Sequence, residues 1–307
     1  MKMVKYVTVA AVLKLFSSCS PMKKLYRTLG NKFGSNKRLQ SGIPDYYIEN
    51  VKWILDLCKK HNVIKDGDKL IELGTGWLHW EATTTRLFFE IEAILFDIWD
   101  NRQLGAFKGY FAELGERIEK EIGIDPAQNE HVQNTIRDIL SVDSFDDIYD
   151  LLGFQYVVEP SGKLNNLQDE SFNVIISLSV LEHIKKDILY EYVQDFYKLL
   201  KPGGYSIHTI SLVDHLYLYD KSVSPKNYLK YSDTVWKYCF ESEVNYINKI
   251  QKSEWLDLFK GAGFDLVEEE SLYSDIGKIK IDKKYKNFDK RDLECISMQV
   301  VHRKPSS

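Results

Sequence analysis

Apolar residues along the chain gather in short runs that have the length of strands. The runs lie at Lys69–Leu73, Glu92–Phe96, Phe154–Val158, Ser171–Leu178, Tyr205–Ile210, Phe264–Glu270 and Glu294–His302. Segments with the period of a helix lie between them, and the clearest covers Ile43–Val63, where apolar residues recur every three or four positions. Strands that alternate with helices favour right-handed crossovers and a parallel, doubly wound sheet.

The last two runs differ from the others, because only a loop without a clear helical pattern separates them. The predicted fold is therefore α/β: a doubly wound, mostly parallel seven-stranded sheet with an antiparallel last strand. Further helices are predicted over His79–Glu90, over Ile188–Leu200, which Lys201-Pro-Gly-Gly204 ends, and over Ser253–Ala262, with Ser253 as N-cap.

Three segments fall outside the regular alternation. Residues 101–153 have a helical pattern broken near Gly123–Pro126 and are long for a connection, which predicts a helical insertion. Residues 211–250 are rich in Tyr and Trp and have little periodicity, so we interpret them as an aromatic insertion. Residues 1–43 form a basic, helical N-terminal extension, and residues 44–307 the main domain.

Composition excludes several classes of protein. The 307 residues carry a net charge of −4, so no overall attraction to nucleic acid is expected. The four cysteines are widely spaced and form no CxxC pair, which argues against a zinc site or a disulfide framework and fits reduced thiols in the cytoplasm. No apolar run approaches the roughly 20 residues that a membrane-spanning helix needs.

The most informative segment is the glycine loop Gly74-Thr75-Gly76, which directly follows a predicted buried strand. Glycines at this position let the backbone approach a ligand closely, and ligands of open sheets bind beyond the carboxyl ends of strands. Asp97 ends the next strand, where a carboxylate can accept hydrogen bonds from ribose hydroxyls. A nicotinamide fingerprint would have a third glycine where this chain has His79.

Later motifs decide between the cofactors. Ser171–Ile184, which contains Leu181-Glu182-His183, and then Leu199-Leu-Lys-Pro-Gly-Gly-Tyr205 follow the glycine loop in order. Together these motifs resemble class I S-adenosylmethionine (SAM)-dependent methyltransferases, over residues 44–304. Lys260-Gly-Ala-Gly-Phe264 and the strand ending at Pro305 also match. The resemblance implies a Rossmann-like fold, SAM as cofactor and methyl transfer to a small-molecule or glycan-like acceptor.

The resemblance also assigns site residues. It implies that Glu72, Gly74, Thr75 and Gly76 surround the methionine part of SAM, that Asp97 holds the ribose, that Ile98 lies against the adenine, that Glu159 is a candidate for the adenine amine, and that Ser177, Leu178 and Ser179 border the cofactor. Leu78 departs from the family pattern, because many members have a third glycine there. Some quinone-biosynthesis methyltransferases bind a divalent metal after the fourth strand, but Ser179 replaces their first acid, so no metal is expected.

Candidate bases lie after the fourth and fifth strands. His183 follows the fourth strand, and Asp214 and His215 follow the fifth, where an acid next to an imidazole can activate a hydroxyl. Each also has an ordinary structural interpretation, as a loop or cap residue. Aromatic side chains of the insertion suit sugar rings and planar rings alike, or they pack a lid; they are Tyr217, Tyr219, Tyr228, Tyr231, Trp236, Tyr238 and Phe240.

Two alternative functions stay open from the residues. A nicotinamide-dependent oxidoreductase would use a similar sheet, and a non-catalytic SAM-binding protein would keep the fold. A nucleic-acid methyltransferase is disfavoured, because Ser177-Leu-Ser-Val stands where amino-methylating DNA enzymes carry an Asn-Pro-Pro-Tyr motif. The aromatic stretch is similar to that of methyltransferases of bacterial surface-glycan and polysaccharide biosynthesis.

The N-terminal segment has a charge pattern of its own. Residues 1–40 contain nine basic residues and no acidic one: Lys2, Lys5, Lys14, Lys23, Lys24, Arg27, Lys32, Lys37 and Arg38. Val4, Val7, Ala11, Leu15 and Phe16 form an apolar helical stripe beside lysines. This predicts either docking on an anionic membrane or lipid-linked acceptor, or a helix packed on the domain. A secretory signal is disfavoured, because Lys14 interrupts the apolar stretch.

Overall fold

The computed structural model describes residues 3–306, and it leaves out the side chains of residues 35, 36, 38 and 39. Lys2 and the Arg38 side chain, two of the predicted basic groups, therefore lie outside the described part. The chain forms two compact units. The glycine-loop unit comprises Leu29–Leu178, Lys198–Ser206 and Lys304–Ser307, and the aromatic-loop unit comprises Met1–Thr28, Ser179–Tyr197 and Ile207–Arg303.

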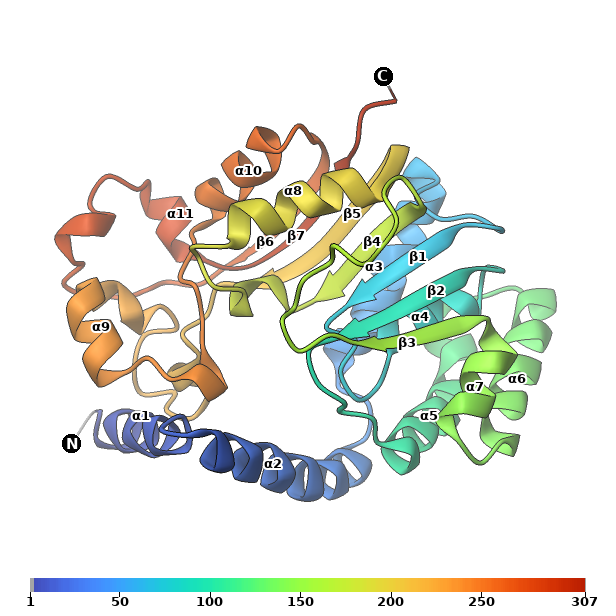
Figure 1. Ribbon diagram of the computed structural model, residues 1–307, viewed down its shortest axis with the longest axis horizontal. Helices are drawn as coiled ribbons and strands as arrows, with labels where there is room; N and C mark the ends of the chain where they lie inside the picture. The colour runs from blue at the N-terminus through green and yellow to red at the C-terminus, as the bar shows by residue number, and fades with distance from the viewer. Residues whose placement is uncertain (1–2, 307) are drawn as a thin grey trace. The chain divides into compact units, whose positions relative to one another are not determined.

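One sheet of seven strands runs through residues 3–306, in the order β3-β2-β1-β4-β5-β7-β6 (Figure 1). The strands are β1 (Lys69–Leu73), β2 (Glu92–Asp97), β3 (Phe154–Val158), β4 (Phe172–Leu178), β5 (Leu200–Ser211), β6 (Asp265–Tyr273) and β7 (Cys295–Arg303). β1 pairs in parallel with β2 and β4, β2 pairs in parallel with β3, and β6 pairs antiparallel with β7. The predicted fold class is confirmed.

Helices occupy the connections between the strands. They are α1 (Val4–Phe16), α2 (Ser20–Ser41), α3 (Asp45–His61), α4 (Trp80–Arg86), α5 (Leu104–Ile122), α6 (Pro126–Ser141), α7 (Phe145–Leu152), α8 (Leu189–Leu199), α9 (Asp233–Cys239), α10 (Lys252–Gly261) and α11 (Lys290–Glu294). Single 3-10 turns include η1 (Leu181–His183), η2 (His215–Leu218), η3 (Asn227–Lys230), η4 (Glu243–Asn245) and η5 (Lys283–Tyr285). α5, α6 and α7 are the predicted helical insertion.

Several predicted boundaries were wrong, and for two of them the hydrogen bonds show why. β5 begins at Leu200 and includes the Pro-Gly-Gly segment, because Gly203 and Gly204 exchange backbone hydrogen bonds of 2.9 Å with Lys304. α10 begins after Gln251 and not after Ser253. The Gln251 N–H donates to Glu254 Oε2 at 2.9 Å, as a capping box requires, whereas Ser253 donates to Asp292.

His79 ties the glycine loop to the helical insertion inside the glycine-loop unit. Its Nδ1 lies 2.8 Å from Thr75 Oγ1 and its Nε2 lies 2.9 Å from Tyr149 Oη. The ring packs 5.3 Å from the Phe145 ring, centroid to centroid, and only 1% of the residue is exposed. Its φ of 50° shortens α4, which starts one residue later than predicted. His79, which stands where a dinucleotide-binding motif has its third glycine, is thus a buried polar residue that connects the glycine loop to α7.

A second core, in the aromatic-loop unit, receives the N-terminal helix. Tyr6, Ala10 and Leu13 of α1 are buried there together with residues of the aromatic insertion and of the segment before β7: Leu216, Tyr228, Leu229, Trp236, Ile247, Ile276, Tyr285 and Leu293. The Tyr6 hydroxyl donates to Asp214 Oδ2 at 2.6 Å, and the Tyr6 N–H donates to Asp220 Oδ2 at 3.1 Å. One face of α1 is therefore part of this unit's core.

Burial of His79 makes the protein sensitive to acid. Burial lowers the pKa of His79 to about 3, against 6.5 in the unfolded chain. The stability that this neutral ring contributes is complete above pH 6.5 and is lost as the pH falls toward 3. His79→Gln should therefore reduce the pH dependence of the free energy of unfolding between pH 6 and 4, by up to about 1.4 kcal/mol per pH unit.

Urea unfolding at a series of pH values measures this slope. His131→Gln, on an exposed position of α6, is the matched control and should keep the slope of the wild type. Equal slopes for His79→Gln and wild type would show that His79 is not the titrating group.

Candidate functional site

The predicted glycine loop and Asp97 lie together at the carboxyl ends of β1 and β2. Gly74 and Gly76 have φ values of 60° and 62°, which side chains with a Cβ rarely adopt. The Gly76 N–H donates to Asp97 Oδ2 at 2.9 Å, and the Thr75 N–H donates to the carbonyl of Phe96 at 3.1 Å. The loop is thus fastened to the end of the neighbouring strand.

Asp97 organises this corner through its carboxylate. Its second oxygen accepts a hydrogen bond from the Ile98 N–H at 2.7 Å, and the residue is 6% exposed. Burial raises the pKa of Asp97, while the backbone N–H groups oppose that shift. A carboxylate has about four acceptor positions, so beside the backbone N–H groups of Gly76, Ile98 and Trp99 it keeps acceptor capacity for a further donor such as a ribose hydroxyl.

Ile98 and Glu159 lie on the same side of this corner. β2 and β3 are in register at Asp97 and Val158, and the Glu159 N–H donates to the carbonyl of Asp97 at 2.9 Å. Ile98 is 47% exposed, and its side chain lies near Gly162. The Glu159 carboxylate accepts from the Ser161 N–H at 2.9 Å, which lowers its pKa. An exposed apolar side chain next to an ionised acid suits a planar ring that carries an amine.

Glu72 belongs to a buried pair of carboxyl groups that the sequence did not reveal. Glu72 is 1% exposed and its Oε2 accepts from the Ala82 N–H at 2.8 Å. Glu81 lies beside it, and Asn50 donates to Glu81 Oε1 at 3.2 Å. Burial raises the pKa of Glu72 well above its usual value, and the neighbouring Glu81 adds to the rise. Two carboxyls this close do not both ionise, so the pair holds a proton beneath the glycine loop.

Ser177 and Leu178 end β4, next to β1. The parallel register pairs Glu72 with Ile176, so Ser177 follows at the level of Leu73 and the glycine loop. Ser177 is 2% exposed, as expected of a residue that borders a ligand by its backbone and not by its side chain. All the predicted cofactor residues of the glycine-loop unit therefore share one edge of the sheet.

A second cluster lies in the aromatic-loop unit and contains Glu182, His183 and His215. One ligand atom from each lies within 4.8 Å of the others. Glu182 Oε1 accepts from the Ser211 N–H at 3.3 Å, whereas Glu182 Oε2 is buried and has no hydrogen-bond partner among the described residues. Burial raises the pKa of Glu182 to about 8. Glu182 is the residue of this cluster that was missing from the predicted bases, although it stands in the Leu-Glu-His motif.

The two imidazoles of the cluster face each other with ring centroids 5.0 Å apart. His183 Nδ1 lies 2.7 Å from the carbonyl of Tyr246, so this nitrogen carries the proton and Nε2 keeps its lone pair. Burial lowers the pKa of His215 to about 4, with a smaller contribution from His183. His215 is therefore neutral at pH 7 and able to accept a proton.

A carboxylate and two neutral imidazoles are also ligands that transition metals bind. Ser179 stands where the family has its first acid, and His215 from another loop offers a third potential ligand atom beside Glu182 and His183. Ser179 itself has a φ of 55°, and its N–H donates to the carbonyl of Thr209 at 2.8 Å. The expectation of a metal-free site accordingly stays a prediction.

Asp214 stabilises the turn that carries His215. Its Oδ1 accepts from the Leu216 N–H at 2.9 Å as the N-cap of η2, and its Oδ2 accepts from the Tyr6 hydroxyl. Burial raises the pKa of Asp214 to about 6. The Asp214 carboxylate thus supports His215 through the backbone of η2. The hydrogen bonds of this carboxylate go to Leu216 and Tyr6, and not to the neighbouring imidazole.

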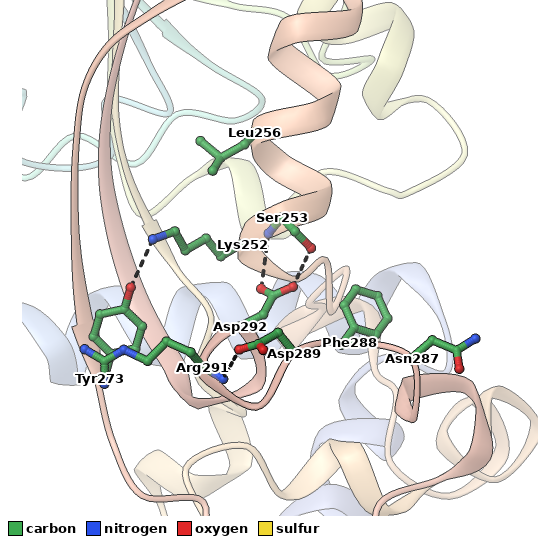
Figure 2. Close-up of a pocket in the computed structure, with 9 residues that line it drawn as sticks. All are labelled: Lys252, Ser253, Leu256, Tyr273, Asn287, Phe288, Asp289, Arg291 and Asp292. Atoms are coloured by element: carbon green, nitrogen blue, oxygen red, sulfur yellow. Dashed lines mark hydrogen bonds between the residues drawn. The ribbon is translucent and has the colours of Figure 1, made fainter.

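A cavity of about 500 Å³ lies elsewhere in the aromatic-loop unit, between α10, β6 and α11 (Figure 2). The guanidinium of Arg291 lies 3.2 Å from the centre of the Tyr273 ring, and the Tyr273 hydroxyl accepts from Lys252 at 3.0 Å. None of the predicted site residues lines this cavity.

Residues 43–269 match the model of a protein family described as "Methyltransferase domain". The chain belongs to this family of SAM-dependent methyltransferases. The match covers the glycine loop, Asp97 and the Leu-Glu-His segment, and so the fold, the cofactor and the enzyme class that the motifs predicted are confirmed. No curated protein matches this methyltransferase.

Solved structures resemble this methyltransferase at low identity. One is Haemonchus contortus phosphoethanolamine N-methyltransferase 2 in complex with SAM (TM-score 0.45, 16% identity, 82% of this chain and 52% of that chain). Others are described as a "putative sarcosine dimethylglycine methyltransferase" from Galdieria sulphuraria (0.46, 14%, 84% and 86%) and as a "putative methyltransferase" from Bacillus halodurans C-125 (0.43, 16%, 81% and 99%). This chain spans about half the length of the Haemonchus contortus protein.

Asp97→Ala tests the ribose assignment. The variant loses an acceptor for the ribose and the fastening of Gly76, so binding of S-adenosylhomocysteine should weaken by about 1–3 kcal/mol, the scale of hydrogen bonds to a charged group. Isothermal calorimetry measures the affinity. Asp100→Ala, which removes an exposed carboxylate paired with Arg102, is the matched control and should bind like wild type. Unchanged affinity for Asp97→Ala would reject the assignment, and tight binding of NAD would reject the cofactor.

Proposed function

We propose that this methyltransferase transfers the methyl group of SAM to an oxygen or nitrogen of a small-molecule or glycan-like acceptor. The bond between the methyl carbon and the sulfonium breaks as the bond to the acceptor forms in line, and S-adenosylhomocysteine leaves with the electron pair. The observation that carries the proposal is the glycine loop fastened to Asp97, in a chain whose family match covers both. The protein's contribution is to position the two reactants and to exclude water.

His215 is the proposed base for a hydroxyl acceptor, and the neutral state of its imidazole supports this role. Because burial lowers the pKa of His215 to about 4, the ring is neutral at pH 7 and its free nitrogen can accept a proton. The His183 ring lies within the same cluster, 5.0 Å from that of His215 between centroids, and is the proposed group that takes the proton up. Asp214 is the proposed positioning group for His215.

The aromatic insertion divides into core and exposed residues, which narrows the proposed acceptor surface. Tyr228 and Trp236 are buried at 1% and 3% exposure and belong to the core of the aromatic-loop unit. Tyr219 and Tyr238 are 41% and 71% exposed, and the Tyr217 ring is half-buried under the ammonium of Lys221 at 3.9 Å. We propose Tyr217, Tyr219 and Tyr238 for contacts with sugar or planar rings.

One further feature supports the proposed setting. The four cysteines are free thiols, which fits a reducing cytoplasm and biosynthesis of a polysaccharide or other surface glycan before export. Among residues 3–306, no helix is both long enough and apolar enough to cross a membrane.

Methyl-labelled SAM tests the proposed function directly. The purified protein is incubated with two acceptor panels, one of mono- and oligosaccharides with nucleotide sugars, the other of small phenols and amines, and product formation is followed by mass spectrometry. Methylated product in either panel supports the proposal. Label transfer only to protein or nucleic acid, with none to either panel, would contradict it.

His215→Ala tests the base. Turnover of a hydroxyl acceptor should fall by roughly 10²–10⁴ while affinity for S-adenosylhomocysteine stays unchanged. In the wild type, turnover should rise with pH through about 4 and be level between pH 6 and 8, because the imidazole must be neutral to accept the proton. His131→Ala is the control and should retain full turnover. A loss smaller than about threefold in His215→Ala would leave the residue a structural role.

A further inference from the structure

α1 is apolar on two opposite faces. Tyr6, Ala10 and Leu13 are buried in the core of the aromatic-loop unit. At 100° per residue, Val4, Ala11 and Leu15 of the predicted stripe lie on the opposite face together with the exposed Thr8, and Val7 and Val12 lie at its two margins. Val4 is 65% exposed, Val7 49%, Val12 46% and Leu15 60%. The two interpretations of this segment thus describe two faces of one helix.

A helix that is apolar all round is ordinarily buried all round. Scattered single apolar residues on a surface need no explanation, but here four exposed Val and Leu side chains occupy one helix of 13 residues. The core of the unit requires only the Tyr6 face. The outer face therefore carries apolar side chains that the fold itself does not use.

Basic residues flank this outer face. Lys5 is exposed on one side, and on the other the ammonium of Lys14 is held by hydrogen bonds to the carbonyls of Lys237 at 3.0 Å and Glu241 at 3.3 Å. These bonds hold a positive charge beside the stripe without neutralising it. Of the next lysines, Lys23 pairs with Glu243, whereas Lys24 is exposed.

α2 repeats the same pattern along its own length. Leu25, Leu29 and Phe33 recur at every fourth position and are 44%, 37% and 67% exposed. Lys32 and Lys37 are exposed on the same helix. No acidic residue occurs before Asp45, so both helices combine exposed apolar side chains with positive charge that no acid of their own balances.

We propose that α1 and α2 dock the enzyme on the surface of an anionic phospholipid bilayer, with the outer stripe of α1 among the lipid headgroups. A bilayer of this kind offers apolar contact and negative charge together, as interfacial helices require. A second copy of the chain would present the same positive face and would be repelled. A nucleic acid would satisfy the lysines and leave the valines and leucines in water.

Co-sedimentation tests the docking. The full-length protein should sediment with vesicles of phosphatidylcholine and phosphatidylglycerol at low salt, and should bind pure phosphatidylcholine vesicles weakly. High salt should release it, because each basic residue near the surface contributes through a screened interaction. Val7→Glu and Leu15→Glu should each lower binding about tenfold or more, since they place a carboxylate in the apolar stripe.

Leu272→Glu is the matched control, because it changes an equally exposed leucine on β6 and should bind like wild type. Thermal melting of the three variants confirms that all remain folded. Absence of binding to anionic vesicles at low salt overturns the proposal, and so does wild-type binding by Val7→Glu and Leu15→Glu. If sedimentation velocity instead shows a dimer that these two substitutions dissociate, the stripe binds a second copy and the lipid proposal is wrong. None of these outcomes depends on the identity of the methyl acceptor.

Discussion

The hydrogen bond from the Gly76 N–H to the Asp97 carboxylate is the constraint on which the cofactor side depends. A left-handed turn at Gly74 and Gly76 has no side chains of its own to stabilise it, so its shape must be fixed from outside. Asp97 does this from the end of the adjacent strand, while its remaining acceptor positions stay open to a ligand. One carboxylate thus sets the shape of the turn and is placed to recognise what binds there, so the site is organised before the ligand arrives.

The cluster of Glu182, His183 and His215, which is the proposed acceptor side, is organised differently, by polar groups that the hydrophobic core does not need. Glu182 keeps an oxygen without a partner among the described residues, and two imidazoles lie close to it. Burying a polar atom without a hydrogen bond costs about 1–3 kcal/mol, and strained or unsatisfied groups of this kind concentrate at functional sites. The left-handed Ser179, directly after β4, is a second such feature.

The sequence predicted most strands to within one residue for a physical reason. β1, β2 and β4 are central, parallel strands buried on both faces, and such strands read as short apolar runs. β6 is the last strand in the sheet order and is partly exposed, so it contains polar residues and lacks a continuous apolar run. The predicted strand therefore ended at Glu270, three residues before the observed end at Tyr273. Ser253 is not the N-cap of α10, because Gln251 occupies that position and forms the capping box with Glu254.

Site residues near one another in the chain were predictable, and those joined over long distances were not. The glycine loop and Asp97 follow from their position after consecutive strands. Nothing local to Asp214 indicates that its carboxylate accepts from Tyr6, or local to His79 that its ring reaches Tyr149. Periodicity along α1 revealed an apolar stripe, but only tertiary structure separates the face that packs from the face that stays exposed.

The Tyr6–Asp214 bond joins residues 208 positions apart, and this separation has a consequence for synthesis. α1 leaves the ribosome well before much of the core that receives it, because that core includes Tyr285 and Leu293. The inner face of the helix therefore lacks part of its native core until the chain has been made as far as Leu293, and non-local contacts of this kind form slowly. A nascent chain, or one truncated before its last strand, carries a helix that is apolar on both sides in water. Such a species would be drawn to chaperones, to lipid or to other copies of itself, so the same helix that completes the folded unit makes its unfinished forms prone to aggregation.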